Sequence, residues 1–233
     1  MVSTSNDNSI PEILKGKGIP NFKEITPVQI NNYIPILIKS LTDEFRTLEN
    51  DLQEKIDKDS NLSWNDLMRP LYQIGEKLRW SWGVASHLNS VSNSKDFREA
   101  YGSQQSEVVR FTNLVGQSEI IYKSLLLLQD DKLNDLSKTQ QRILYSQLLS
   151  MKNRGVGLDL RTQKEFNTDS ERLADISNIF SNNVIDATNN WSLLLTDKNQ
   201  VSGLPNRALE LLANSAINHG DRSKNEDQLP NAK

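Results

Sequence analysis

Apolar residues recur at gaps of three and four along most of the chain, the spacing that places them on one face of a helix. The best-specified case begins at Ser63, a natural N-cap followed by Asp66 at the capping-box position. The segment over 63–93 therefore predicts a long helix with one buried face, against which the other helices pack. Its apolar positions are Leu67, Leu71, Ile74, Leu78, Trp82, Ala85 and Leu88.

Thr26 as N-cap, followed by Pro27 at the first helical position, predicts the start of an earlier helix. Pro35 falls inside the apolar pattern, so we expect a short helix there, broken or kinked, and then a longer one to about Ile56. Pro70 lies well past the Ser63 cap in the same way. It predicts a kink or an early restart of that helix.

The second half of the chain continues with helices. Gly155 is placed for a left-handed C-cap in the RGVGL segment. The last long helix carries an apolar stripe with the spacing of a helix in a bundle: Phe166, Leu173, Ile176, Phe180, Val184, Ala187 and Trp191. Residues 192–196 lose this period, which favours at most one short β segment, and 204–216 predict a final helix.

These patterns predict an all-α protein, an elongated multi-helix array. Residues 1–21 are polar and punctuated by proline and glycine, which predicts a flexible or loosely docked arm. Residues 22–217 form the helical domain, and 218–233 hold too few apolar residues to fold, which predicts a disordered polar tail. The hydrophobic content of 36% is typical of a helical array in which much of the surface is exposed to solvent.

Composition narrows the classes of function. The net charge of -3 leaves no electrostatic footprint for nucleic acid or an anionic membrane, so neither is an expected partner. The absence of cysteine excludes disulfides and thiolate chemistry. The first residues do not resemble a signal peptide, and no apolar run is long enough to span a membrane. We therefore expect a cytoplasmic protein.

Candidate catalytic residues are missing. A zinc peptidase helix carries two histidines four positions apart with a glutamate beside the first, and neither His87 nor His219 has that context. We expect His87 to be a partly buried, hydrogen-bonded helix residue. The sequence contains no G-x-S-x-G nucleophile motif either. No catalytic, cofactor-binding or metal-ligating residue is predicted.

Two features are candidates for binding. Trp80 and Trp82 point about 200° apart on a helix, so Trp82 continues the buried stripe while Trp80 either packs on another helix or offers a surface to a peptide or partner domain. Asn183, Asp186 and Asn190 share one polar face. This face is either solvated or lines a channel that holds the backbone of an extended peptide.

Several segments resemble a known family. The segments LSWNDLMRPLYQIGEKLRWSWGVASHLNSV (62–91), RGVGLD (154–159) and ERLADISNIFSNNVIDATNNWSLLLTD (171–197) are similar to the N-terminal region of oligopeptidase A. That family consists of zinc metallo-oligopeptidases related to thimet oligopeptidase and neurolysin. The resemblance covers about residues 20 to 216 in the family's order.

The resemblance implies one helical wall of a peptidase in which a deep channel separates two halves. In the intact family the other half carries HExxH, binds one zinc ion and cleaves short peptides. HExxH does not occur in this sequence, so no zinc ligand can be assigned and no cofactor is expected in this chain. We expect a truncated or split form that is inactive alone.

Three interpretations follow from the resemblance. The chain could pair with a separate catalytic half as its partner. It could instead be a non-catalytic module that binds short peptides or a helical partner. It could also be a remnant without function, and then the face toward the missing half would expose apolar patches.

Overall fold

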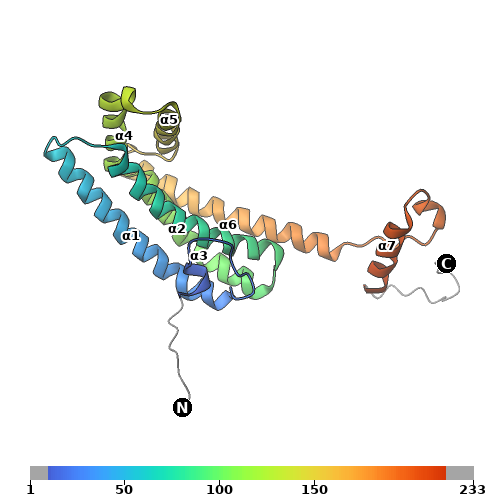
Figure 1. The fold of residues 1–233 in the computed structure, drawn as a ribbon. Coiled ribbons are helices and arrows are strands. Elements are labelled where there is room, and N and C mark those ends of the chain that lie inside the picture. Colours follow the sequence, from blue (N-terminus) through green and yellow to red (C-terminus); the bar gives the residue numbers. More distant parts are fainter. Residues whose placement is uncertain (1–9, 219–233) are drawn as a thin grey trace, which may run out of the picture. The chain divides into compact units, whose positions relative to one another are not determined.

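The computed structural model describes residues 10–218, except for the side chain of residue 131. Over these residues it is all-α, as predicted, with no strand (Figure 1). Seven α-helices are described: α1 (Pro27–Asp57), α2 (Trp64–Val91), α3 (Lys95–Gly116), α4 (Glu119–Lys132), α5 (Lys138–Asn153), α6 (Leu160–Asn190) and α7 (Asn206–Asn218). Three short 3-10 helices join them: η1 (Glu12–Leu14), η2 (Leu133–Asp135) and η3 (Lys198–Val201).

The chain divides into two compact units, residues 1–179 and 180–233. The first holds α1 to α5 and α6 as far as Ile179, and the second holds the rest of α6 and α7. All of the buried residues described lie in the first unit. None of the described helices is long and apolar enough to cross a membrane.

Local capping starts the helices as the sequence predicted. Ser63 and Asp66 form the reciprocal capping box of α2, and Thr26 accepts a hydrogen bond from the backbone of Gln29 at the start of α1. Gly155 adopts the left-handed φ of 86° just after α5, the conformation that favours glycine at a helix end.

The core lies where α1, α2 and α3 meet and continues along α4 and α5. The buried stripe of α1 includes Ile34, Leu41 and Phe45, all fully shielded from solvent. Ile13 of η1 is also fully buried. This part of the expected flexible arm is therefore packed on the core, while residues 1–9 lie outside the described residues. Of the tail predicted over 218–233, Asn218 is the last residue of α7 and the rest lies outside the described residues.

The expected break at Pro35 does not occur. Pro35 lies inside the single helix α1, on its exposed side, where the backbone carbonyl that loses its partner can bond to water. The buried isoleucines Ile34 and Ile38 hold both sides of this position to the core. Similarly, α2 runs through Pro70 without a restart.

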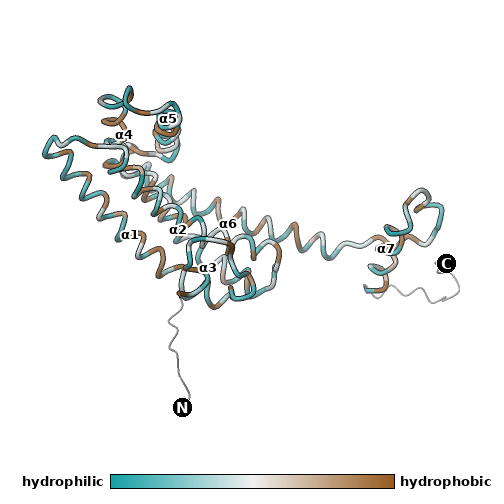
Figure 2. The backbone as a smooth tube through the Cα atoms, viewed as in Figure 1, coloured by the Kyte–Doolittle hydropathy of each residue, from teal (hydrophilic) through white to brown (hydrophobic). Residues whose placement is uncertain are grey.

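The apolar stripe of α6 is the main departure from expectation. Its large side chains Leu173, Ile176, Phe180 and Val184 are exposed, as is Trp191 just after the helix, and no residue of α6 is buried. Figure 2 shows hydrophobic residues recurring along α6 and in the α7 segment. The short strand allowed for 192–196 is absent, because these residues have no regular structure.

Candidate functional site

Trp80 anchors the N-terminal segment. Its ring is partly buried against the core, and its indole Nε1 donates a hydrogen bond to the carbonyl oxygen of Gly18 at 3.2 Å. Trp82, on another side of α2, stacks on Tyr101 with ring centroids 4.3 Å apart. These contacts favour the packing interpretation of Trp80 over a surface for a partner.

His87 is exposed on α2, so the prediction of a partly buried residue was wrong. Its ring centroid lies 5.2 Å from that of Phe22. His219 lies outside the described residues. Among the residues that the structure describes, no group of three or more histidine, cysteine, aspartate or glutamate side chains could hold a metal ion. The described part of the chain therefore does not fit the zinc of the intact family.

Asn183, Asp186 and Asn190 lie on the last turns of α6. Asn183 and Asn190 are exposed, and Asp186 is partly buried. At about 100° per residue, these side chains lie directly beside the row formed by Phe180, Val184 and the other exposed apolar residues. The polar face predicted from the sequence thus borders an exposed apolar surface.

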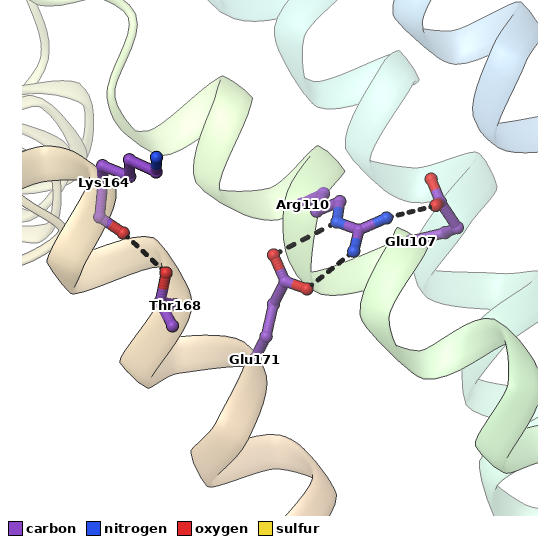
Figure 3. Close-up of polar contacts among 5 residues, drawn as sticks. All are labelled: Glu107, Arg110, Lys164, Thr168 and Glu171. Carbon is purple, nitrogen blue, oxygen red and sulfur yellow. Dashed lines mark hydrogen bonds and ion pairs between the residues drawn. The ribbon is translucent and has the colours of Figure 1, made fainter. Parts of the chain in front are cut away.

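A polar clamp joins α6 to α3 within the first unit (Figure 3). The Arg110 guanidinium donates to both carboxylate oxygens of Glu171, through Nε at 3.1 Å and Nη2 at 2.9 Å, and to Glu107 at 2.6 Å. Hydrogen bonding to Glu171 and the charges of both glutamates raise the pKa of Arg110 above its ordinary value. Arg110 therefore keeps its positive charge at any physiological pH.

Amide side chains extend this attachment in both directions along α6. Gln117 and Asn167 exchange hydrogen bonds of 2.8 and 3.2 Å, and Gln117 also donates to the backbone carbonyl of Arg154 at 2.9 Å. Closer to the end of the unit, Gln105 donates to the carbonyl of Ala174 at 2.9 Å. Polar side chains therefore fix α6 on α3.

The two faces of α6 are nearly opposite. Asn167, Glu171, Ala174 and Asn178 form the row toward α3, and helix geometry puts the centre of the apolar stripe roughly 140° away from it. An amphipathic helix normally turns its apolar face inward. In this protein the polar face is inward and the apolar face is outward.

Two hollows lie in the first unit. One, of about 560 Å³, lies where α1, α3, α4 and α6 meet, and there Glu49 accepts hydrogen bonds of 2.6 Å from Arg46 and from Ser118. The other, of about 750 Å³, lies between α1 and α2. It is spanned by the Lys77–Glu44 ion pair at 2.8 Å. Several of the charged side chains around the two hollows form ion pairs, as in Lys77–Glu44 and Arg46–Glu49, which suits contacts that hold helices together.

The clamp was not predicted from the sequence. Arg110 and Glu171 are 61 residues apart, and no local spacing signals such a pair. The inward row of α6 did carry a signal, because Asn167, Glu171, Ala174 and Asn178 are small or polar at gaps of three and four. Such a row marks a second face that can support close helix packing.

Comparison with known proteins identifies the family to which this fold belongs. The model of the family "Neurolysin/Thimet oligopeptidase, N-terminal domain" matches residues 34–163. Probable cytosolic oligopeptidase A of Arabidopsis thaliana is 31% identical over 99% of this chain and 32% of its own length. Oligopeptidase A of Haemophilus influenzae is 31% identical over 89% of the chain and 30% of its own length, and that of Escherichia coli is 31% identical over 82% and 27%.

The chain spans about a third of the length of the curated relatives it matches. The match to the family model covers more than half of the chain, and it includes the helices that build the core. The chain therefore belongs to the neurolysin/thimet oligopeptidase family, which is a family of zinc metallopeptidases, and it carries that family's N-terminal domain.

Proposed function

We propose that this chain is the non-catalytic helical half of an oligopeptidase A-type peptidase and is inactive by itself. Its function is to complete a catalytic part that binds zinc and hydrolyses short peptides. The observation that carries the proposal is the family match over 34–163, in relatives three times as long, together with a sequence that contains no HExxH. The zinc would be held by the catalytic part.

The first test measures hydrolysis of a short quenched fluorescent peptide. The purified chain is expected to show no cleavage that zinc stimulates and a chelator abolishes. Robust, chelator-sensitive hydrolysis by the chain alone would contradict the inactive state.

The second test asks for a positive result. In a chimera, this chain replaces the third of Arabidopsis cytosolic oligopeptidase A that it matches. The replacement can be nearly complete, because the alignment covers 99% of this chain. Chelator-sensitive hydrolysis by this chimera supports the proposal. A folded chimera that binds zinc and lacks hydrolysis contradicts it.

A second candidate function is a stand-alone module that binds peptides. It is supported by Asn183 and Asn190, exposed amides that could bond an extended backbone, beside an exposed apolar row. Titration of the chain with short peptides should then give a saturable change in tryptophan fluorescence, since Trp191 lies in that row. The absence of such a change at millimolar peptide would count against this function.

The proposal also places the protein in the cytoplasm. One relative, probable cytosolic oligopeptidase A of Arabidopsis thaliana, is named for this location, which supports the proposal. Cell fractionation with an antibody to the chain tests it, and recovery in a membrane or organelle fraction would contradict it.

A further inference from the structure

One face of α5 is both cationic and apolar. Lys138, Arg142, Tyr145, Leu149 and Lys152 follow one another at alternating gaps of four and three, so they lie within a sector of about 80° and form a row about 21 Å long. This row, here called the α5 face, is exposed along its whole length, and Tyr145 and Leu149 are 47 and 61% exposed. Exposed apolar side chains rimmed by charge mark a candidate interaction surface.

The sequence around the α5 face carries one sign of charge. Residues 136–158 include two lysines and two arginines but no aspartate or glutamate, although the whole chain has a net charge of -3. Within the part of the chain that the structure describes, none of the three cations of the α5 face forms an ion pair, whereas Lys77 pairs with Glu44 between α1 and α2. The α5 face is therefore a local positive surface on an acidic protein.

Local helix stability does not explain these charges. Lys138 is the first residue of α5 and Arg142 lies one turn later, and positive charge near the N-terminus of a helix opposes the helix dipole. The start of α5 is stabilised instead by the capping box of Ser137 and Gln140. Lys152, in the last turn, is the cation that suits the dipole. The helix thus gains nothing from two of its three cations.

The α5 face is held in a fixed orientation. α5 packs mainly on α4 (Figure 1), and its buried residues are Leu144, Leu148 and Met151. The centre of this buried row lies roughly 110° from the α5 face. Gln141 donates hydrogen bonds to the carbonyl oxygens of Leu133 and Leu136 at 2.9 and 3.0 Å, which join α5 to the turn before it. A surface fixed in this way loses little conformational entropy on binding.

We infer that the α5 face binds an acidic peptide segment of another protein, one with apolar side chains between its carboxylates. Arg142 and Lys152 are about 15 Å apart along the helix axis, and Tyr145 and Leu149 fill the interval. The apolar side chains of the segment pack on Tyr145 and Leu149, and its carboxylates pair with the cations at both ends. The inference does not depend on the proposed function, because the whole face lies in the first unit.

Three other occupants fit the α5 face less well. Double-stranded DNA carries one charge about every 1.7 Å along its axis, whereas the α5 face has only three cations over about 21 Å. A helix that lies on an anionic membrane turns a broad apolar face to the lipid, and the buried apolar residues of α5 are already packed in the protein. A second copy brings the same positive charge to the same face.

The experiment measures the fluorescence anisotropy of a labelled peptide of about 16 residues, which as a helix spans the row. The peptide has glutamates toward both ends and leucines in the middle, and the control peptide has glutamine in place of each glutamate. The full chain is expected to bind the acidic peptide saturably, and several-fold more weakly when the salt is raised from about 0.05 to 0.3 M. Absence of binding, or equal binding of both peptides, would overturn the inference.

Charge reversal locates the site. Arg142→Glu combined with Lys152→Glu should weaken binding of the acidic peptide on the order of tenfold, because two attractions become repulsions. Lys23→Glu combined with Lys39→Glu is the matched control, since it changes the net charge equally at two exposed lysines outside α5. All four positions are exposed, so melting should stay unchanged in both variants. Equal weakening by the two variants would overturn the inference.

The apolar part of the site is tested by Leu149→Ala. This variant should weaken binding several-fold, because it removes part of the exposed apolar surface. Its matched control is Ile36→Ala, at an exposed position of α1. Binding that is unchanged in Leu149→Ala would overturn the inference of an acidic segment with an apolar centre.

The remaining outcomes concern the other occupants. Tighter binding to a DNA duplex, or to vesicles of equal parts phosphatidylserine and phosphatidylcholine, than to the acidic peptide would overturn the inference. So would a dimer, detected by light scattering, that Arg142→Glu combined with Lys152→Glu converts to a monomer. The chelator-treated Arabidopsis chimera should bind the peptide as tightly as the isolated chain, and loss of binding there would mean that the attached part covers the α5 face, which would overturn the inference. A chimera that binds the peptide but lacks hydrolysis before chelation contradicts only the proposed function.

Discussion

Pro35 lies on the exposed side of α1, in the middle of a helix that its ring weakens. Proline in a helix interior is about 3 kcal/mol less favourable than alanine, since it removes one hydrogen bond and crowds the preceding turn. Pro35→Ala should therefore raise the free energy of unfolding by about 1–3 kcal/mol in urea titration, with the exposed Lys39→Ala as the control in the same helix. An unchanged or lower stability would show that the helix is strained elsewhere.

Asp66 links the capping box of α2 to the end of α1. Its carboxylate accepts from the Ser63 hydroxyl at 2.7 Å and pairs with Lys55 at 3.0 Å. The Ser63 contact, with a smaller contribution from Lys55, holds the pKa of Asp66 below its ordinary value of 3.8.

The pH dependence follows from this shift. A carboxyl group whose pKa is lower in the folded state contributes stability above its unfolded value, and this is lost as pH falls through the folded value. Asp66→Asn should therefore destabilise the protein at neutral pH by about 1 kcal/mol, and the difference should narrow below pH 3.8. The exposed Asp43→Asn serves as control. A difference that stays constant down to acid unfolding would contradict the role of the charge.

At the scale of elements, the attachment of α6 to α3 depends on the Arg110–Glu171 pair. The side chains are 56 and 24% exposed, so a double-mutant cycle with alanine should give a coupling of about 0.2–1 kcal/mol that weakens with salt. Losing the pair should also speed hydrogen exchange along α6 near Glu171. The Arg79–Glu76 pair within α2 is the control, because its loss should leave α6 unaffected. Equal exchange in both double variants would contradict the clamp.

The same elements show what the sequence could predict. The start of α2 depends on Ser63 and Asp66, which are three residues apart, so a local pattern was sufficient. The stripe of α6 correctly predicted an amphipathic helix, but periodicity does not say what the apolar face meets. That direction is set by pairs such as Arg110–Glu171, which are distant in sequence. Asn183 and Asn190 were found as a polar face, and the apolar surface beside them was mistaken for core.

At the scale of the whole molecule, the two units differ in what stabilises them. The first buries a continuous core from Ile13 to Met151, whereas the described part of the second, 180–218, has no buried residue. Segments with few buried apolar contacts open at low free energy. In the isolated chain, amides of α7 should therefore exchange at least about a hundredfold faster than those in the middle of α1, as measured by hydrogen–deuterium exchange.

The chimera supplies the contrast for this measurement. If the catalytic part packs on the exposed apolar side chains of α6, exchange in the last turns of α6 should slow in the chimera, while exchange in the middle of α1 stays unchanged. Protection of α7 in the isolated chain equal to that of α1 would mean that the second unit is stable without a partner. The exposed leucines after α6 would then need no further chain to stabilise them, and the physical case for a catalytic part that covers this region would rest on the exposed apolar side chains of α6 alone.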